Sequence, residues 1–215
     1  MKGLLLKDLY ILKHAYFKNL TLVLVIYTAL GLAMKLSFFF NIMGWMFGFY
    51  VVGLLSLDKA SNWDFYASAL PLSKPQLVGE KFILLLLCAL AGFAYGMVMS
   101  PLIQWRMGTP ITESLLVALI VTLVVLLYFG IMMPFVYKFG VEKGRTGMLL
   151  AIAAFGGIIM FLGSTGRLSD ETPIAAFSWM DENPLPTIAL LSAAAIVVYA
   201  VCWIVSVAIY NKKEF

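Results

Sequence analysis

Long apolar stretches separated by short polar segments are the main pattern in this chain. A helix needs about 20 mostly apolar residues to cross a bilayer. Residues 17–57 are too many for one helix, and the polar positions Lys35, Ser37 and Asn41 predict a tight turn between two helices there. Four later stretches each predict one further helix: residues 82–104, 114–137, 147–165 and 187–210. The pattern therefore predicts an all-α integral membrane protein with six transmembrane helices in a single domain, residues 1–215.

The composition agrees with lipid as the main solvent of this chain. Of the 215 residues, 63% are hydrophobic and 12% are charged, and the mean hydropathy is +0.98. Soluble domains carry about 25% charged residues, and a water-soluble fold of this size has too little interior to hide so much apolar surface. The first apolar run is followed at once by a second, which predicts a retained anchor rather than a cleaved signal peptide.

Three segments outside the predicted spans are long enough to have a structure of their own. In residues 1–18, Leu5, Leu9, Leu12 and Tyr16 follow helical spacing with polar residues between them, which predicts an amphipathic helix on the membrane surface. Residues 58–81 form a predicted cytoplasmic loop. Residues 166–186 form a predicted extracellular loop, acidic and rich in proline.

The distribution of lysine and arginine predicts the orientation, because cytoplasmic loops are enriched in them. Twelve of the fifteen basic residues fall on one predicted side, which we interpret as cytoplasmic together with both termini. This topology accounts for the net charge of +4 without a nucleic-acid partner. The twelve are Lys2, Lys7, Lys13, Lys18, Lys59, Lys74, Lys81, Lys138, Lys143, Arg145, Lys212 and Lys213.

The motifs of most enzyme classes are absent from the sequence. There is no G-x-x-x-x-G-K-[ST] phosphate-binding loop, no H-E-x-x-H metal motif and no G-x-S-x-G nucleophile turn. The single histidine, His14, lies on the amphipathic segment, and Cys88 and Cys202 lie in apolar runs where no disulfide is expected. Charged residues are confined to the predicted helix ends, which argues against a proton- or ion-coupled carrier. We therefore expect no enzymatic activity, metal or cofactor in this chain.

The cytoplasmic loop contains a short aromatic segment, Ser61-Asn62-Trp63-Asp64-Phe65-Tyr66, followed by Leu70-Pro71-Leu72-Ser73-Lys74. It predicts a short amphipathic helix that ends before the proline. Aromatic side chains on such a helix are suited to docking into a groove of a partner protein. They are equally suited to anchoring the loop among lipid headgroups. Physical reasoning on these residues leaves both interpretations open.

This segment resembles the small bacterial type-2 ABC exporter permeases. The resemblance rests on an acidic residue, Trp and Tyr followed by Leu-Pro-Leu-Ser-Lys and a span that begins Lys-Phe, and on the opening Lys-Gly-Leu-Leu-Leu-Lys-Asp-Leu-Tyr. It covers the whole chain, including the six-span layout. The common Ser-Leu-Pro of that family reads Ala69-Leu70-Pro71 here.

The resemblance implies a permease that pairs with itself or a sister permease and binds two separate cytoplasmic ABC ATPase subunits. ATP and Mg²⁺ would then be bound by the partner, in keeping with the missing phosphate-binding loop. In that family the loop after the second span acts as a coupling helix seated on the ATPase. By position, the implied ATPase contacts are Trp63, Asp64, Tyr66, Pro71 and Lys74.

Two G-x-x-x-G pairs, Gly44/Gly48 and Gly92/Gly96, lie in the second and third predicted spans. Such pairs allow close helix approach. They predict either an interface with a second permease or packing within one bundle, and the sequence leaves this open.

The resulting functional hypothesis is the transmembrane subunit of an ATP-driven exporter that works by alternating access. The apolar spans suggest a hydrophobic or amphipathic cargo, such as a peptide, a lipid or a drug. Two other classes stay open: a membrane scaffold or immunity protein without transport, and an autonomous carrier. A separate ATPase partner would distinguish the first hypothesis from both.

Overall fold

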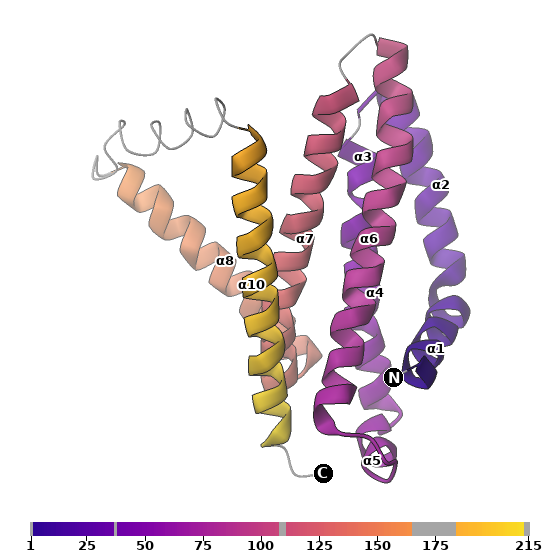
Figure 1. The fold of residues 1–215 in the computed structure, drawn as a ribbon, viewed down its shortest axis with the longest axis vertical. Helices are drawn as coiled ribbons and strands as arrows, with labels where there is room; N and C mark the ends of the chain where they lie inside the picture. Colours follow the sequence, from indigo (N-terminus) through magenta and orange to yellow (C-terminus); the bar gives the residue numbers. More distant parts are fainter. Residues whose placement is uncertain (1, 37, 108–110, 165–183, 213–215) are drawn as a thin grey trace.

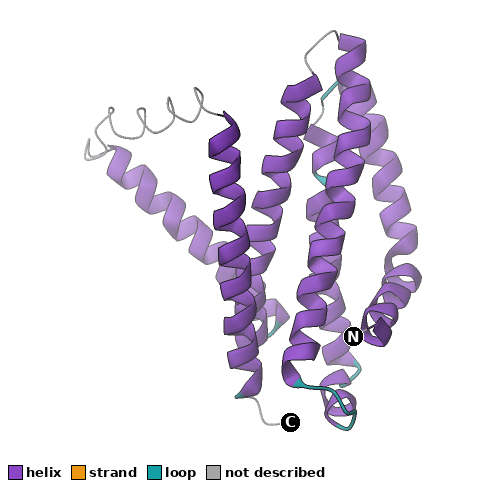
Figure 2. Cartoon of the chain, in the orientation of Figure 1, coloured by secondary structure: helices purple, strands orange, loops and turns teal. Residues whose placement is uncertain are grey.

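The structure is a computed structural model that describes residues 2–36, 38–107, 111–164 and 184–212. Within these residues every regular element is helical and no strand occurs (Figure 2). In chain order the elements are α1 (Lys2–Ile11), the π-helix η1 (Leu12–Tyr16), α2 (Phe17–Met34), α3 (Phe38–Asn41), α4 (Met43–Ala60), α5 (Trp63–Ser68), α6 (Lys74–Met107), α7 (Ile111–Phe139), α8 (Val141–Ser164) and α10 (Pro184–Asn211).

Five helical segments of the described chain are long and apolar enough to cross a membrane. They are Gly3–Met34, Phe38–Ala60, Lys74–Trp105, Leu115–Phe139 and Pro186–Asn211. The predicted fifth span, residues 147–165, falls on α8, which is not among these five, so the count of six stays a prediction. The predicted loop 166–186 lies outside the described residues as far as residue 183.

The first two spans separate at the polar break that the sequence predicts. Helix α2 ends at Met34, and Lys35 adopts a left-handed conformation with φ 55° and ψ 36°. The amide of Leu36 then donates to the carbonyl of Gly31, which closes the turn. A left-handed residue just past the last helical turn is a common way to end a helix. The chain returns through α3 into α4 (Figure 1).

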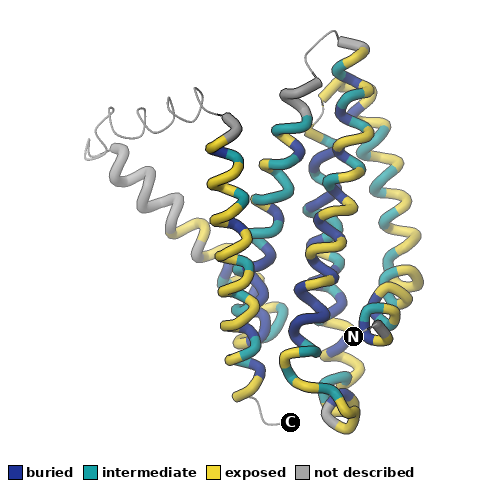
Figure 3. The backbone as a smooth tube through the Cα atoms, in the orientation of Figure 1, coloured by how far each residue is buried: buried dark blue, intermediate teal, exposed yellow. Residues whose placement is uncertain are grey.

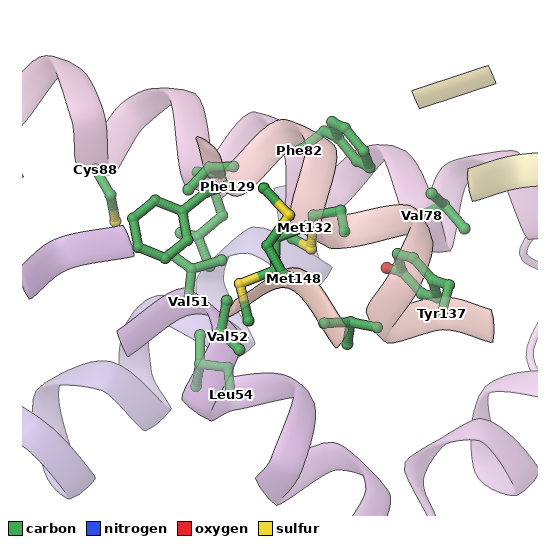
Figure 4. Packing of buried hydrophobic residues seen from close by; sticks show 14 of the residues in the cluster. Val51, Val52, Leu54, Val78, Phe82, Cys88, Phe129, Met132, Tyr137 and Met148 are labelled. Atoms are coloured by element: carbon green, nitrogen blue, oxygen red, sulfur yellow. The ribbon is translucent and has the colours of Figure 1, made fainter. Parts of the chain in front are cut away.

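Most residues of the buried apolar cluster come from α4, α6 and α7. Phe129 and Met132 of α7 are fully buried, as are Val51 of α4 and Leu84 of α6. Figure 4 shows Phe129 and Met132 beside Val51, with Cys88 of α6 on the far side of the ring. Helix α10 packs along α7 and α6, whereas α8 leans away from α10 (Figure 1).

The outer helices expose their apolar side chains. Only 6% of the apolar windows of the first and last candidate spans is buried, against 44% of the window in Phe38–Ala60. Figure 3 shows the exposed faces of α2 and α10 in yellow. Leu22, Val25, Ile196 and Val197 are all more than half exposed. Apolar surface of this extent on two helices of membrane-spanning length indicates lipid contact.

The four glycines of the two G-x-x-x-G pairs have close contacts within this chain. Gly44 of α4 faces Gly92 of α6, where an added Cβ would lie 2.6 Å from the Gly44 Cα. The ring of Phe129 lies against Gly48, and the Asn41 Oδ1 atom lies 2.7 Å from the position of a Cβ at Gly96. These are contacts of α4 with α6 and α7, and of α6 with α3.

The glycine- and lysine-rich segment after residue 139 is a helix connection. Gly140 has φ +87°, a conformation that side-chain-bearing residues rarely adopt, and its amide donates to the carbonyl of Val136. One turn later, a Cβ at Gly144 would lie 2.8 Å from the Val136 Cα. The two glycines thus let α8 turn back closely against the end of α7.

Residues 2–16 of the predicted surface helix 1–18 form α1 and η1, and a position of this segment on the membrane surface stays a prediction. Helix α1 continues through η1 into α2, and the backbone bends where Tyr16 takes φ −117° and ψ −8°. Leu9 of the expected apolar stripe is 47% exposed, whereas Asp8 is completely buried. The π-turn rotates the later residues relative to a regular helix, and the contacts of Asp8 described below hold α1 in this orientation.

Candidate functional site

One end of the bundle collects charged side chains from several helices. Helix α5 lies there with α1, the C-terminal ends of α4 and α10 and the N-terminal end of α6 (Figure 1). This end carries the segment that the sequence singled out, and also buried acidic and basic residues that the sequence placed only at helix ends.

Four of these residues form an ion-pair cluster, made of Lys7, Asp8, Asp58 and Lys81. The Lys7 Nζ atom lies 3.0 Å from Asp8 Oδ1 and 3.0 Å from Asp58 Oδ1. The Lys81 Nζ atom lies 2.5 Å from Asp8 Oδ2 and 2.5 Å from Asp58 Oδ2. Each ammonium therefore bridges both carboxylates, and the cluster joins α1, α4 and α6.

Burial makes this cluster sensitive to the loss of any member. The side chain of Asp8 is fully buried and that of Lys81 is 5% exposed. Bringing two charges out of water costs several kcal/mol each, so a buried pair adds little net stability over an apolar pair of the same shape. Removing one member, however, leaves a buried charge without its partner. The cluster thus fixes how α1, α4 and α6 sit against one another.

Helix α5 begins at a reversal of the chain and contacts the cluster at once. Asn62, just before α5, has φ 53° and ψ 36°, a left-handed conformation that asparagine tolerates better than most residues. Its side chain makes no cap hydrogen bond to the start of α5. The ring of Trp63 lies 3.8 Å from Lys7 Nζ, a cation–π contact between α5 and α1.

A second set of contacts ties the same end to α10. The hydroxyl of Tyr210 donates to Asp64 Oδ1 at 2.9 Å, so Asp64 contacts α10 rather than capping α5. The Tyr210 ring in turn lies edge-on to Tyr137 of α7, with centroids 5.7 Å apart. Lys74, at the start of α6, donates to the carbonyl of Asn211 at 3.1 Å, where the C-terminal end of a helix favours a cation.

The opposite face of α5 points outward. Phe65 is 68% exposed and Tyr66 62% exposed, with their rings edge-on to each other. Leu70 is 44% exposed and Pro71 is also exposed, whereas Ala67 is buried against the bundle. The implied ATPase contacts therefore divide in the structure: Trp63, Asp64 and Lys74 have partners within this chain, and Tyr66 and Pro71 face solvent.

A polar cavity of about 310 Å³ lies beside the cluster. Glu80 lines it, is 1% exposed as a residue, and its Oε1 atom has no hydrogen-bond partner among the described residues. In the cluster two carboxylates face two ammonium groups, and Glu80 makes none of these ion pairs. The lining comes from six helices and the connection after α7: Leu55, Asp58, Lys59, Trp63, Asp64, Leu77, Glu80, Lys81, Val136, Tyr137, Lys138, Phe139, Gly140, Val141 and Tyr210.

The described residues offer no group of three or more His, Cys, Asp or Glu side chains that could hold a metal ion. The carboxylates of Asp8 and Asp58 are instead paired with lysines, and that of Asp64 accepts from a tyrosine hydroxyl. The chemistry available here is that of charge pairing and hydrogen bonding between helices, which suits a site that transmits movement.

Sequence reasoning missed the cluster because its members are 51 and 73 residues apart along the chain. Asp58, Glu80 and Lys81 each read as a charge at a helix end, where the interface keeps it solvated. One signal was present: Asp8 is the only acidic residue among residues 1–57. It interrupts a basic segment, and a nearby lysine from another helix was the natural partner to seek.

Among the comparisons with known proteins, one family model matches nearly the whole chain. No curated protein and no solved structure matches it. A family model described as ABC-2 family transporter protein matches residues 3–211, from the beginning of α1 to the end of α10. The chain therefore belongs to the ABC-2 family of transporter proteins, and it is a multi-pass membrane permease of the ABC transporter class.

Proposed function

We propose that this protein is the permease subunit of an ATP-driven ABC exporter and that α5 is the coupling helix to a separate ATPase subunit. In this proposal ATP and Mg²⁺ are bound by the ATPase, and a second permease, either another copy or a sister chain, completes the transporter. Membership of the ABC-2 family supports the permease role, while export and the partner subunits belong to the proposal.

The observation that carries the proposal is the two-sided arrangement of α5. Its outer face presents Phe65 and Tyr66, aromatic side chains of the type enriched at the centres of protein interfaces. Its inner face contacts Lys7 through Trp63 and Tyr210 through Asp64. A partner that moves α5 would therefore act on α1 and α10 through direct contacts. That arrangement favours docking of α5 on a protein over simple anchoring among lipid headgroups.

The proposed movement starts at the ATPase and reaches the spans through the ion-pair cluster. Trp63 contacts Lys7, and Lys7 is held by Asp8 and Asp58. A shift of α5 would change the position of Lys7 against these carboxylates, and with it the angle between α1, α4 and α6. The cluster has two ammonium groups that each bridge two carboxylates, so it can re-pair rather than break. Alternating access by re-packed helices requires such a set of exchangeable contacts.

The orientation in this proposal places the α5 end in the cytoplasm. Lysines from α1, α4, α6 and α7 gather at that end, in agreement with the enrichment of basic residues on the cytoplasmic side. The helices beyond this end are apolar, which suits a hydrophobic or amphipathic cargo moved outward.

The test is co-purification from the native membrane in mild detergent, followed by identification of any ATP-hydrolysing protein of separate sequence. We expect such a subunit to accompany the wild-type chain. Tyr66→Ala should abolish its recovery, because truncation of a central aromatic at an interface costs about 2 kcal/mol or more. Trp63→Ala should leave the ATPase bound but reduce transport, since Trp63 contacts Lys7 within the chain.

Phe38→Ala is the matched control, because Phe38 is 64% exposed and begins α3, which lies far from α5 along the bundle (Figure 1). It should leave ATPase recovery unchanged. Absence of any ATPase from the wild-type preparation would refute the proposal and favour an autonomous carrier or a non-transporting scaffold. Equal ATPase recovery with Tyr66→Ala and wild type would refute the role of α5 alone.

A further inference from the structure

A second hollow of about 270 Å³ lies on the side of the bundle, and no residue of α5 lines it. We call it the lateral groove. One wall comes from α1, η1 and the start of α2, and the other from α4 and α6. Its lining residues are Leu9, Leu12, Lys13, Tyr16, Phe17, Leu20, Phe47, Tyr50, Leu84, Leu87, Cys88 and Ala91.

The lateral groove is apolar apart from one charged side chain, Lys13. The rings of Tyr16 and Tyr50 pack against each other at a tilt of 37°, with centroids 4.9 Å apart, and the Tyr16 hydroxyl lies 2.6 Å from the position of a Cβ at Gly53. The floor of the groove is therefore fixed by aromatic rings held against α4. An apolar groove with a defined floor is suited to a chain-like hydrophobic ligand.

The position of the groove places it in the hydrocarbon region. Its α6 wall begins at Leu84, less than one turn beyond Lys81 of the ion-pair cluster, and ends at Ala91. At 1.5 Å per residue it follows α6 for about 10 Å toward the middle of the span. The helical segments that form its walls are all candidate membrane spans. The molecules that reach this groove from the side are consequently lipids.

Charge decides which lipid is favoured. Lys13 has no ion pair among the described residues, and its neighbours His14 and Lys18 are exposed. Asp8, the only carboxylate in residues 1–57, is already held by Lys7 and Lys81. No acidic residue lines the groove. The groove therefore offers Lys13 no carboxylate of this chain, and basic residues beside a groove between spans favour an anionic headgroup.

We propose that the lateral groove binds an acyl chain of an anionic phospholipid from the leaflet on the α5 side, with the lipid phosphate paired with the ammonium of Lys13. The bound lipid fills the space between η1 and α6, next to the contact of Asp8 with Lys81. It thereby supports α1 in the orientation that the ion-pair cluster requires. Lipid composition then becomes a regulator of how α1 sits on the bundle.

The experiment is native mass spectrometry of the detergent-purified full-length chain, titrated with phosphatidylglycerol or with phosphatidylcholine of the same acyl chains. We expect one phosphatidylglycerol to be retained preferentially by the wild type. Lys13→Gln should weaken its binding about fivefold, the effect of one lysine near an anionic surface. Lys18→Gln is the control, because Lys18 is exposed nearby but does not line the groove.

A second pair of variants tests the apolar part of the site. Leu87→Trp should fill the groove and displace the lipid, whereas Leu90→Trp should not, since Leu90 is 48% exposed on the same helix outside the lining. Equal phosphatidylglycerol binding by Leu87→Trp and Leu90→Trp would overturn the site. Equal retention of phosphatidylcholine and phosphatidylglycerol by the wild type, or equal effects of Lys13→Gln and Lys18→Gln, would overturn the anionic headgroup.

Discussion

The ion-pair cluster makes a quantitative prediction for Asp8→Asn. Asp8 contacts two ammonium groups, Lys7 at 3.0 Å and Lys81 at 2.5 Å, from a completely buried position. Unit charges about 3 Å apart attract by about 5–6 kcal/mol at an effective dielectric constant of about 20. The desolvation of a buried carboxylate, several kcal/mol, offsets much of this attraction. Asparagine has nearly the same shape, avoids that cost and can still accept a hydrogen bond.

What the substitution leaves behind determines the net effect. Lys81, 5% exposed, would keep Asp58 as its ion-pair partner, and Lys7 would likewise keep Asp58. Two ammonium groups would then share one carboxylate in the cluster. Breaking a buried pair by removing one partner costs about 3–5 kcal/mol of stability. Because Asp58 remains as a partner of both lysines, we expect a loss at the lower end, about 3 kcal/mol. For a chain of this size that corresponds to a fall of about 6–12 °C in melting temperature.

The assay is thermal unfolding of the purified chain in one detergent at one salt concentration, with Glu142→Gln as the control. Glu142 lies exposed in the first turn of α8, so the loss of its charge should leave the melting temperature within about 1–2 °C of the wild type. If Asp8→Asn melts together with Glu142→Gln, the ion pairs contribute nothing to holding α1, and our account of its orientation is refuted.

Three further perturbations follow from the same contacts. Glu80→Gln should leave the melting temperature nearly unchanged in that assay, because it removes a carboxyl beside a cluster in which two carboxylates already balance two ammonium groups. A fall in melting temperature as large as that of Asp8→Asn would contradict this charge balance. Tyr210→Phe removes the hydrogen bond to Asp64 and should speed hydrogen exchange of the α5 amides up to about tenfold. The control is Tyr199→Phe, which loses a hydrogen bond to the Phe82 carbonyl and should leave exchange of the α5 amides unchanged. Equal exchange in both variants would argue against the α5–α10 link. Gly92→Ala should destabilise the chain by about 1–3 kcal/mol in denaturant titration, since its Cβ meets the Gly44 backbone. Gly147→Ala, with no atom within 4 Å of its Cβ, should be neutral or stabilising. The same loss of stability in both variants would show that Gly92 is not needed for the close approach of α4 and α6.

Local sequence patterns predicted those elements of the fold that depend on the length of an apolar stretch or on turn residues. The polar break at Lys35 marks the end of α2, and the segment from Trp63 folds as a short helix that ends before Pro71. Membership of the ABC-2 family, inferred from the residues around Trp63 and from residues 2–10, is confirmed by the family match. Each of these depends on residues close together in the chain.

The contacts of the candidate site depend on residues far apart in the chain. The prediction from Leu5, Leu9, Leu12 and Tyr16 assumed a regular helix that faces a flat membrane surface. In the structure η1 rotates the last residues of this segment, and Asp8 faces the bundle. The sequence pattern also could not predict that, of the implied ATPase contacts, Trp63 lies on the inner side of α5 and Tyr66 on the outer side. Six residues of helix present side chains in all directions, and only the neighbouring α1 and α10 decide which of them are inside.

The sequence by itself determined that this protein lies in a membrane, because so many apolar residues have no other stable solvent. It also determined the turn after α2 and the end of α5 before Pro71, because polar breaks and proline act over a few residues. The tertiary structure alone decided that Lys7, Asp8, Asp58 and Lys81 meet, that Asp64 bonds to Tyr210, and that Lys13 stands beside a groove without an acidic partner. The physical reason is the range of the interactions. Hydrophobic periodicity is read along one helix, whereas charge pairing acts between atoms that only the packing of different helices brings within 3 Å.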